Sequence, residues 1–389
     1  MQVTRRLTSK PRRGGFTLIE LLVVISIIAV LAALILPGIG AARETARRTQ
    51  CMSQMRNVSF AFQTYATNNS GALPYLETWD PANVNAPSTS LRIWASGAAA
   101  SPGRTAAPWS VSLLPYLEFQ TLYDRLVTPG TGPEAVGTLQ QTSIQVYTCP
   151  DDATENIGGN LSFAANGGYM TSGNWTAAQA GGLPVGSHTL NSYLFSFNNY
   201  NAAGTPANSP TLDSREVQAG TGLLVEETNS FGFRAQIDRI PDGQTHTVLL
   251  TENLQAVTWF NPSPTAVGVF VPVTGTAPGA STAGQYADAI TGSANGIGPD
   301  PSVGGKSQSL FFGNALSVAA YAGTINSNLG AAEGTAPRPS SNHPNVVNVF
   351  FADGHGGPLS QNIADSVWMR LISSAGEKFG QVVLSDADF

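Results

Sequence analysis

Residues 12–20 read Arg-Arg-Gly-Gly-Phe-Thr-Leu-Ile-Glu, and they lead into an apolar stretch that runs from Phe16 to Leu36. Only three of the 21 residues in this stretch are polar. As a helix, the stretch would be about 31 Å long, which matches a hydrocarbon core of ~30 Å. The sequence therefore predicts one membrane-spanning helix near the N-terminus.

The charges on either side of the apolar stretch predict its orientation. Five Lys or Arg residues fall within the first 13 positions, whereas only Arg43, Arg47 and Arg48 follow closely after it. Because Lys and Arg are retained on the cytoplasmic side, we expect the N-terminus in the cytoplasm. The prediction is a single-pass inner-membrane protein whose larger part is periplasmic or exposed at the cell surface.

Three kinds of N-terminal segment share this pattern, and they differ in where they are cleaved. A secretory signal peptide would be cut after the apolar stretch, near residues 40–42, and a plain anchor would not be cut. A prepilin-type leader would be cut between Gly15 and Phe16. Glu20 favours the leader, because a carboxylate in an apolar helix costs roughly 2.5–3.5 kcal/mol and usually has a charged partner. Cleavage before Phe16 would create an α-ammonium group four residues from Glu20.

The run Gly15-Phe16-Thr17-Leu18-Ile19-Glu20 resembles the cleavage and methylation motif of type IV pilins and type II secretion pseudopilins. The resemblance implies that a prepilin peptidase cuts after Gly15 and that the new N-terminal Phe16 is N-methylated. It also implies that Glu20, at mature position five, pairs with the N-terminus of a neighbouring subunit during assembly. Pro37, at mature position 22, stands where pilins often have a helix-loosening proline.

The first helix is expected to continue past Pro37 as an amphipathic segment over residues 37–70. Its less polar positions recur every three or four residues, at Met52, Met55, Ser59, Phe62 and Tyr65. The run Asn68-Asn69-Ser70-Gly71, followed by Pro74, predicts its end. We expect the apolar side of this segment to pack against the globular part of the chain.

Residues 71–389 have the composition of a turn-rich β domain. Charged residues make up 11% of the chain, against a typical ~25%, and Gly (41) and Pro (25) are abundant. Runs rich in Val, Tyr, Phe and Thr predict strands at 144–149, 192–198, 245–252, 267–273 and 346–351. Short helices are predicted at 112–126 and 365–373, and loops or insertions at 199–222 and 274–340.

The predicted fold class is α+β. A long N-terminal transmembrane helix would pack on an antiparallel β-sheet, and a large loop-rich β region would extend that sheet. The domain boundaries that follow are a leader over 1–15, a membrane span over 16–36, an amphipathic continuation over 37–70 and an extracytoplasmic domain over 71–389.

Four motifs in the larger part resemble a planctomycete-type domain of unknown function (number 1559), also described as solute-binding-like. They are Cys149-Pro150-Asp151-Asp152, Asn166-Gly167 with Ser192-Tyr193, residues 242–253 and residues 343–354. The resemblance covers most of residues 37–389. His343-Pro344-Asn345-Val346 departs from the His-x-Gly-Gly sequence usual in this family. Since the family has no established activity, the resemblance implies architecture rather than chemistry.

The two cysteines, Cys51 and Cys149, do not form a metal-spaced pair. In an oxidising compartment they could form a disulfide, and otherwise they would be two half-buried thiols. Five of the 19 basic residues lie in the leader, so the rest of the chain is more acidic than the net charge of −6 indicates. It has no cluster of basic residues for nucleic acid.

Isolated acidic residues are predicted to lie in turns and at strand ends. Asp353-Gly354 predicts a hairpin turn, and a metal role for Asp353 with His343 or His355 would lack a third ligand. Asp151-Asp152 could help to hold Ca²⁺, although a turn is the preferred interpretation. Glu252 is expected to be a solvated or hydrogen-bonded residue at the end of its strand.

The predicted function is that of a non-enzymatic pilin- or pseudopilin-like subunit or surface protein without a cofactor. Its expected partners are a prepilin peptidase, the membrane, and copies of itself or related pilin-like subunits, and nucleic acid is not among them. The alternative is a membrane-tethered module whose loops bind carbohydrate or another solute. Sugar stacking would then involve exposed tryptophans among Trp79, Trp94, Trp109 and Trp175.

Overall fold

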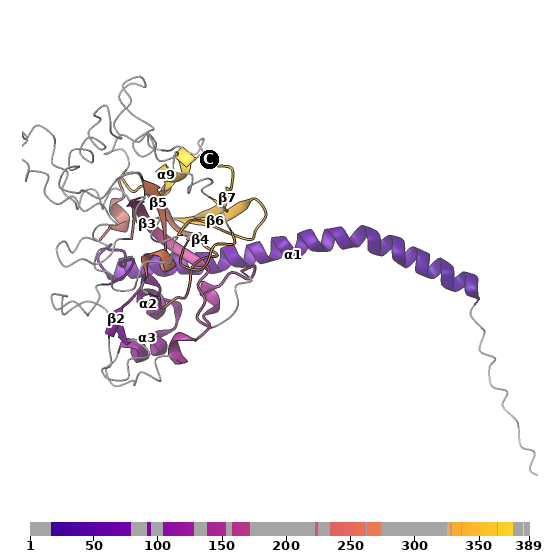
Figure 1. Cartoon of the computed structure of the whole chain (residues 1–389), viewed down its shortest axis with the longest axis horizontal. Coiled ribbons are helices and arrows are strands. Elements are labelled where there is room, and N and C mark those ends of the chain that lie inside the picture. The colour runs from indigo at the N-terminus through magenta and orange to yellow at the C-terminus, as the bar shows by residue number, and fades with distance from the viewer. Residues whose placement is uncertain are drawn as a thin grey trace, which may run out of the picture. The chain divides into compact units, whose positions relative to one another are not determined.

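The computed structural model describes residues 17–78, 92–94, 104–127, 138–152, 158–171, 222–224, 234–261, 263–273, 325–326, 329–335, 337–363, 365–375 and 384. The chain divides into two compact units, residues 1–47 and 48–389. Helix α1 (Leu18–Asn68) begins in the first unit and ends in the second (Figure 1).

In the first unit, α1 exposes a continuous apolar surface. Leu18 is 78% exposed, and Leu34 and Leu36 are each 74% exposed. Among the described residues, α1 is the one helix long and apolar enough to cross a membrane, and none of its most apolar part is buried. Exposed apolar side chains on this scale are stable in lipid rather than in water, as the predicted membrane span requires.

In the second unit, α1 is buried along one side. Its buried positions are Cys51, Met55, Val58, Ser59, Ala61, Phe62 and Ala66. The helix ends at Asn68, where the predicted stop signal lies, and Gly71 has a positive φ of 86°. The Gly71 N–H donates to the Ala66 carbonyl at 2.8 Å, so the last turn is closed by a glycine that tolerates left-handed backbone.

A five-stranded sheet lies at the centre of the second unit (Figure 1). Its strands, in spatial order, are β5 (Gly268–Val273), β3 (Phe163–Thr171), β4 (Val248–Glu252), β6 (Val346–Phe351) and β7 (Gly356–Ser360). The α+β class is confirmed, but the sheet is mixed rather than antiparallel, because β3 and β5 run parallel. A separate two-stranded sheet pairs β1 (Arg92–Trp94) with β2 (Arg104–Ala106).

Three strand predictions overlap the observed strands β4, β5 and β6. The prediction over 144–149 is wrong, because Gln145–Tyr147 forms the 3₁₀ helix η2, and the one over 192–198 lies outside the described residues. Asn166-Gly167, part of the second family motif, lies in β3, which was not predicted as a strand. Most of the predicted loops at 199–222 and 274–340 fall outside the described residues as well.

The predicted helix over 112–126 is divided into three pieces. These are α2 (Trp109–Leu113), η1 (Leu114–Leu117) and α3 (Gln120–Val127). The division falls at Glu118, whose φ of 68° is left-handed and cannot continue a helix. The prediction over 365–373 is confirmed by α9 (Asp365–Ile372), while α7 (Pro264–Val267) and the 3₁₀ helix η4 (Ile237–Arg239) were not predicted.

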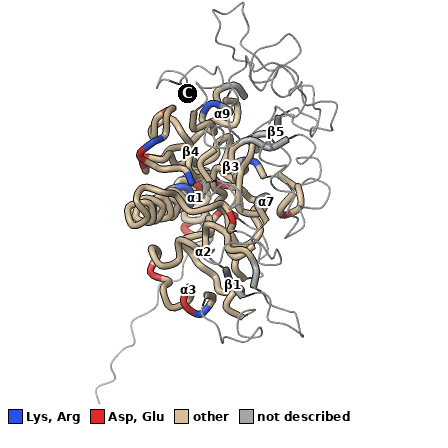
Figure 2. The backbone as a smooth tube through the Cα atoms, turned by 90° about the vertical axis from the view of Figure 1, so that its left-hand side faces the viewer, with Lys and Arg blue, Asp and Glu red and all other residues tan. Residues whose placement is uncertain are grey.

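One apolar core joins the buried side of α1 to the helices and the sheet of the second unit. Trp109 is fully buried in it, stacks against Phe62 with ring centroids 5.2 Å apart, and donates its indole N–H to the Val267 carbonyl. Charged residues are few and scattered along the described chain (Figure 2). A charge inside this core is costly unless hydrogen bonds or a partner of opposite charge compensate it.

Candidate functional site

The processing residues Gly15 and Phe16 lie outside the described residues, which begin at Thr17. Thr17 and Glu20 form a reciprocal cap on the first turn of α1. The Glu20 carboxylate accepts hydrogen bonds from the Thr17 N–H at 2.9 Å and from its hydroxyl at 2.8 Å, while the Glu20 N–H donates to Thr17 Oγ1. The Thr-x-x-Glu spacing of a capping box is visible in the sequence. The pairing of Glu20 with a neighbouring N-terminus involves a second copy and stays a prediction.

Pro37 lies inside α1 and does not end it. A proline in a helix removes one backbone N–H donor and crowds the preceding turn, so it weakens the helix locally. Its role in assembly also stays a prediction.

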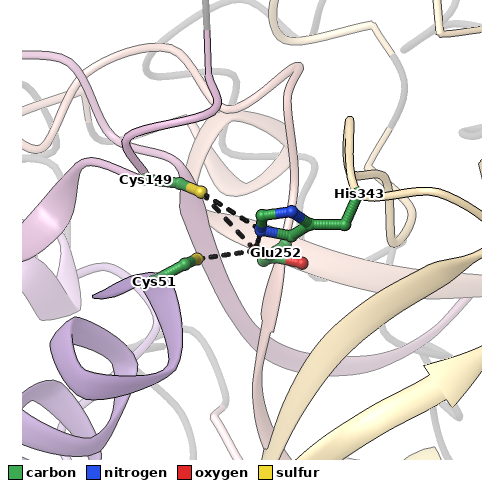
Figure 3. A group of neighbouring side chains, drawn as sticks. All are labelled: Cys51, Cys149, Glu252 and His343. Carbon is green, nitrogen blue, oxygen red and sulfur yellow. Dashed lines mark hydrogen bonds and ion pairs between the residues drawn. The ribbon is translucent and has the colours of Figure 1, made fainter. Parts of the chain in front are cut away.

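A second site lies deep in the larger unit, where four side chains from separate segments meet (Figure 3). Cys51 belongs to α1, Cys149 follows η2, Glu252 is the last residue of β4 and His343 precedes β6. All four are at most 4% exposed. One donor atom from each lies within 4.8 Å of the other three.

The Glu252 carboxylate is the hub of this cluster. Its Oε1 accepts a hydrogen bond from Cys51 Sγ at 2.6 Å and lies 3.3 Å from His343 Nε2. Cys149 Sγ lies 3.7 Å from Glu252 Oε1 and 3.7 Å from His343 Nε2. In Figure 3 the two sulfur atoms and the imidazole ring converge on the carboxylate from three sides.

Further hydrogen bonds hold the four residues in place. The Asn348 backbone N–H donates to Glu252 Oε2 at 2.7 Å, and its side-chain amide donates to Oε1 at 3.1 Å. The Cys149 N–H donates to the Ser162 hydroxyl, which in turn donates to Asp152. On the far side of the imidazole ring, His343 Nδ1 faces Asp151 Oδ2 at 3.6 Å.

The environment alters the ionisation of these groups. Burial opposes the charge on Glu252, but hydrogen bonds from His343, Asn348 and Cys51 outweigh it and lower the pKa of the carboxyl. Burial raises the pKa of the Cys51 thiol. The pKa of the Cys149 thiol is lowered by hydrogen bonding to Cys51 and to His343. Cys149 is therefore the thiol that ionises more readily.

Comparison with known proteins assigns both parts of the chain. A family model described as a protein of unknown function (DUF1559) matches residues 40–366. The chain belongs to the DUF1559 family. A second model, the prokaryotic N-terminal methylation motif, matches residues 10–36. No curated protein and no solved structure matches the chain.

The two family matches confirm both resemblances seen in the sequence. This DUF1559 chain is a type IV pilin-like protein that is processed at its N-terminus, and its long apolar helix makes it membrane-anchored. The methylation motif implies processing by a prepilin peptidase and an association with a membrane or a pilus. The DUF1559 match gives no specific function, so the chemistry of this part must come from its residues.

Several sequence interpretations of the DUF1559 part need correction. The structure places Cys51 and Cys149 together, although their spacing did not indicate a metal site, and both thiols are free and fully buried. For Glu252 the structure decides between the two expected alternatives, because this last residue of its strand is hydrogen-bonded and, at 2% exposure, is not solvated. Asp353 pairs at 2.6 Å with His355, but His343 belongs to the Glu252 cluster instead.

The structure also places the predicted turn residues and some of the tryptophans proposed for sugar binding. Asp353-Gly354 forms the predicted hairpin turn between β6 and β7. Asp151-Asp152 forms the preferred turn, in which the Asp152 N–H donates to the Cys149 carbonyl at 3.0 Å, and its role in holding Ca²⁺ stays a prediction. Trp109 is buried and cannot stack on a sugar. Trp79 and Trp175 lie outside the described residues, and for Trp94 only the backbone is described.

Proposed function

We propose that the chain is a non-enzymatic type IV pilin- or pseudopilin-like subunit, held in the membrane and assembled through α1. The observation that supports this most directly is the division of α1 into two surfaces. Its first part exposes apolar side chains along its length, whereas its later part, from Cys51 to Ala66, is buried in the core of the larger unit. Such a helix leaves one apolar surface for lipid or for the same helix of another subunit.

The position of Glu20 supports assembly over simple anchoring. A carboxylate inside an apolar helix is stable only if another group compensates its charge. Within the described part of one chain, the hydrogen bonds to it come from the Thr17 N–H and hydroxyl, which carry no positive charge. After cleavage at Gly15, the α-ammonium of Phe16 in an adjacent subunit would supply the missing positive charge, and each pairing would fix the axial offset between two helices.

The described part of the larger unit favours a non-enzymatic role. Its most concentrated group of reactive side chains is the cluster around Glu252, and every side chain in this cluster is buried. A substrate could not reach these atoms without local unfolding. In this proposal the larger part of the chain lies outside the cytoplasm, where pilins and secretion pseudopilins are assembled.

A co-purification experiment tests this function. Two copies of the full chain, carrying different C-terminal tags, are expressed with their prepilin peptidase, cross-linked in intact cells and solubilised in detergent. We expect Glu20→Ala to be processed normally but to recover the second copy about tenfold less than wild type, since an unpaired buried charge costs more than the ~1.4 kcal/mol that a factor of ten represents.

Ser26→Ala is the matched control in the same helix, because the Ser26 hydroxyl donates to the Val23 carbonyl of its own helix one turn earlier. It should assemble as wild type does. Mass spectrometry of the purified chain should find an N-methylated Phe16 as the first residue. Wild-type recovery of the second copy by Glu20→Ala would contradict the assembly role, and a mature N-terminus elsewhere would contradict the processing on which that role depends.

A further inference from the structure

We propose that Cys51, Cys149, Glu252 and His343 bind one Zn²⁺ ion that fastens the buried part of α1 to the end of strand β4. The inference is independent of assembly, because all four residues belong to the larger unit. It concerns how this unit is held together.

The donor set is the first argument. Two sulfur atoms, one imidazole nitrogen and one carboxylate oxygen are four ligands of the kinds that Zn²⁺ takes in proteins. Ca²⁺ and Mg²⁺ prefer oxygen ligands alone, so two cysteines exclude them as good occupants. Four protein donors also fill the tetrahedral shell of a structural zinc site and leave no position for a substrate.

The distances between donors are the second argument. With zinc–sulfur bonds of about 2.3 Å and zinc–nitrogen or zinc–oxygen bonds of about 2.1 Å, neighbouring donors in a tetrahedron lie about 3.4–3.8 Å apart. The cluster shows 3.3 Å between His343 and Glu252 and 3.7 Å from Cys149 to each of them. Cys51 Sγ is closer to Glu252 Oε1, at 2.6 Å, so these two atoms would separate by about 1 Å when both bind the ion.

The groups behind the donors are the third argument. Histidine ligands of zinc usually turn their other ring nitrogen toward a carboxylate or a carbonyl. Here Nε2 of His343 faces the cluster, while Nδ1 faces Asp151 Oδ2 at 3.6 Å. Glu252 is also oriented from behind by the two Asn348 donors. These contacts would turn a lone pair of His343 Nε2 and one of the Glu252 carboxylate toward the centre of the cluster.

The charge balance is the fourth argument. The buried Glu252 carboxylate brings negative charge into an apolar core, where unpaired charge is costly. A divalent cation would neutralise the carboxylate and one thiolate, and it would also favour ionisation of the second thiol. The same four residues without a metal would rely on His343 alone for positive charge.

Metal analysis of the intact protein tests the proposal. The full chain is produced with zinc in the medium, purified in detergent through a tag that needs no metal resin, and analysed by plasma mass spectrometry. We expect about one zinc per chain in the wild type, and a loss of at least ~90% of it in Cys149→Ser and in His343→Gln. His355→Gln is the matched control, because the His355 side chain is half exposed and its described contacts, with Asp353 and with the Phe351 ring, lie outside the cluster. It should keep its zinc.

Cobalt substitution keeps the test decisive if a variant fails to fold. Wild-type protein is stripped with a chelator and titrated with Co²⁺, and we expect a sulfur-to-cobalt charge-transfer band with visible bands of tetrahedral intensity that saturate at about one equivalent. Cysteine alkylation after denaturation in chelator, without reductant, should modify both Cys51 and Cys149. A Cys51–Cys149 disulfide, wild-type protein without zinc, or full zinc content in Cys149→Ser would each overturn the proposal.

Discussion

Cys149 Sγ lies 3.7 Å from His343 Nε2, although the two residues are 194 positions apart in the chain. The contact exists because two connections return to the same end of β4. The Cys149 N–H donates a hydrogen bond to the hydroxyl of Ser162, just before β3. The Ser340 N–H donates to the Glu252 carbonyl at 3.1 Å. The end of one central strand thus collects side chains from segments that share no local motif.

The cleavage site offers a direct prediction at Gly15. Replacing this glycine with leucine should leave the leader attached. A peptidase that cuts after glycine is expected to have no room for a side chain at that position. The full-length mass of the protein purified from membranes is the measurement, and the precursor should account for nearly all of the chain.

Gly38→Ala is the control for this experiment, since nothing lies within 4 Å of an added Cβ at that position in α1. It should be processed as wild type is. A Gly15→Leu chain that still begins at Phe16 would show that the cut does not depend on Gly15.

The hairpin turn between β6 and β7 gives a prediction about stability. Gly354 has a φ of 90°, and a Cβ there would lie 2.3 Å from Gln63 Nε2 on α1. Gln63 can move, but the left-handed backbone would remain strained, so Gly354→Ala should lower the free energy of unfolding by about 1–3 kcal/mol. Urea unfolding of the full chain in detergent, followed by tryptophan fluorescence, measures the change. All six tryptophans lie in the larger unit.

Gly357→Ala is the comparison in the same hairpin. An added Cβ at Gly357 meets no atom within 4 Å, and its φ is not positive. We expect its free energy of unfolding to stay within about 0.5 kcal/mol of wild type. Equal losses in the two variants would mean that the turn conformation at Gly354 contributes nothing specific.

Tyr147 predicts how stability depends on alkaline pH. Its side chain is fully buried and its hydroxyl donates to the Ser110 carbonyl at 2.6 Å, and burial raises the pKa of this phenol well above 10. Above pH ~10 the unfolded chain therefore releases a proton that the folded chain retains. The contribution of Tyr147 to stability is complete below that pH and is lost as the pH rises toward the folded pKa.

Tyr147→Phe removes this titration and isolates it. At pH 8 the variant should be less stable than wild type by about 1–3 kcal/mol, since the buried Ser110 carbonyl loses its donor. Between pH 10 and 11 the stability of wild type should fall more steeply than that of Tyr147→Phe, by up to ~1.4 kcal/mol per pH unit. Urea midpoints at each pH measure both curves, and parallel curves would contradict a retained proton at Tyr147.

The sequence predicted the elements whose signals are local. The apolar run, Pro37 and the Asn-rich stop define α1, and alternating Val, Asn and Phe residues define β6 with its Asp353-Gly354 turn. Residues 163–171 were missed as a strand, because Ala, Asn and Gly have low β propensity, and β3 is stabilised instead by pairing with strands on both sides. Residues 144–149 were wrongly predicted as a strand because a short apolar run does not distinguish a strand from a buried turn.

By itself, then, the sequence determined the membrane helix, the processing motif and the family of the larger part. These depend on composition and spacing within a few turns of chain, where hydrophobicity and sterics act directly. Only the tertiary structure decided that Cys51, Cys149, Glu252 and His343 form one site, since no two of them share an element. Their proximity comes from strand pairing and core packing over long separations, and the buried cluster at the end of β4 follows from that packing rather than from any motif.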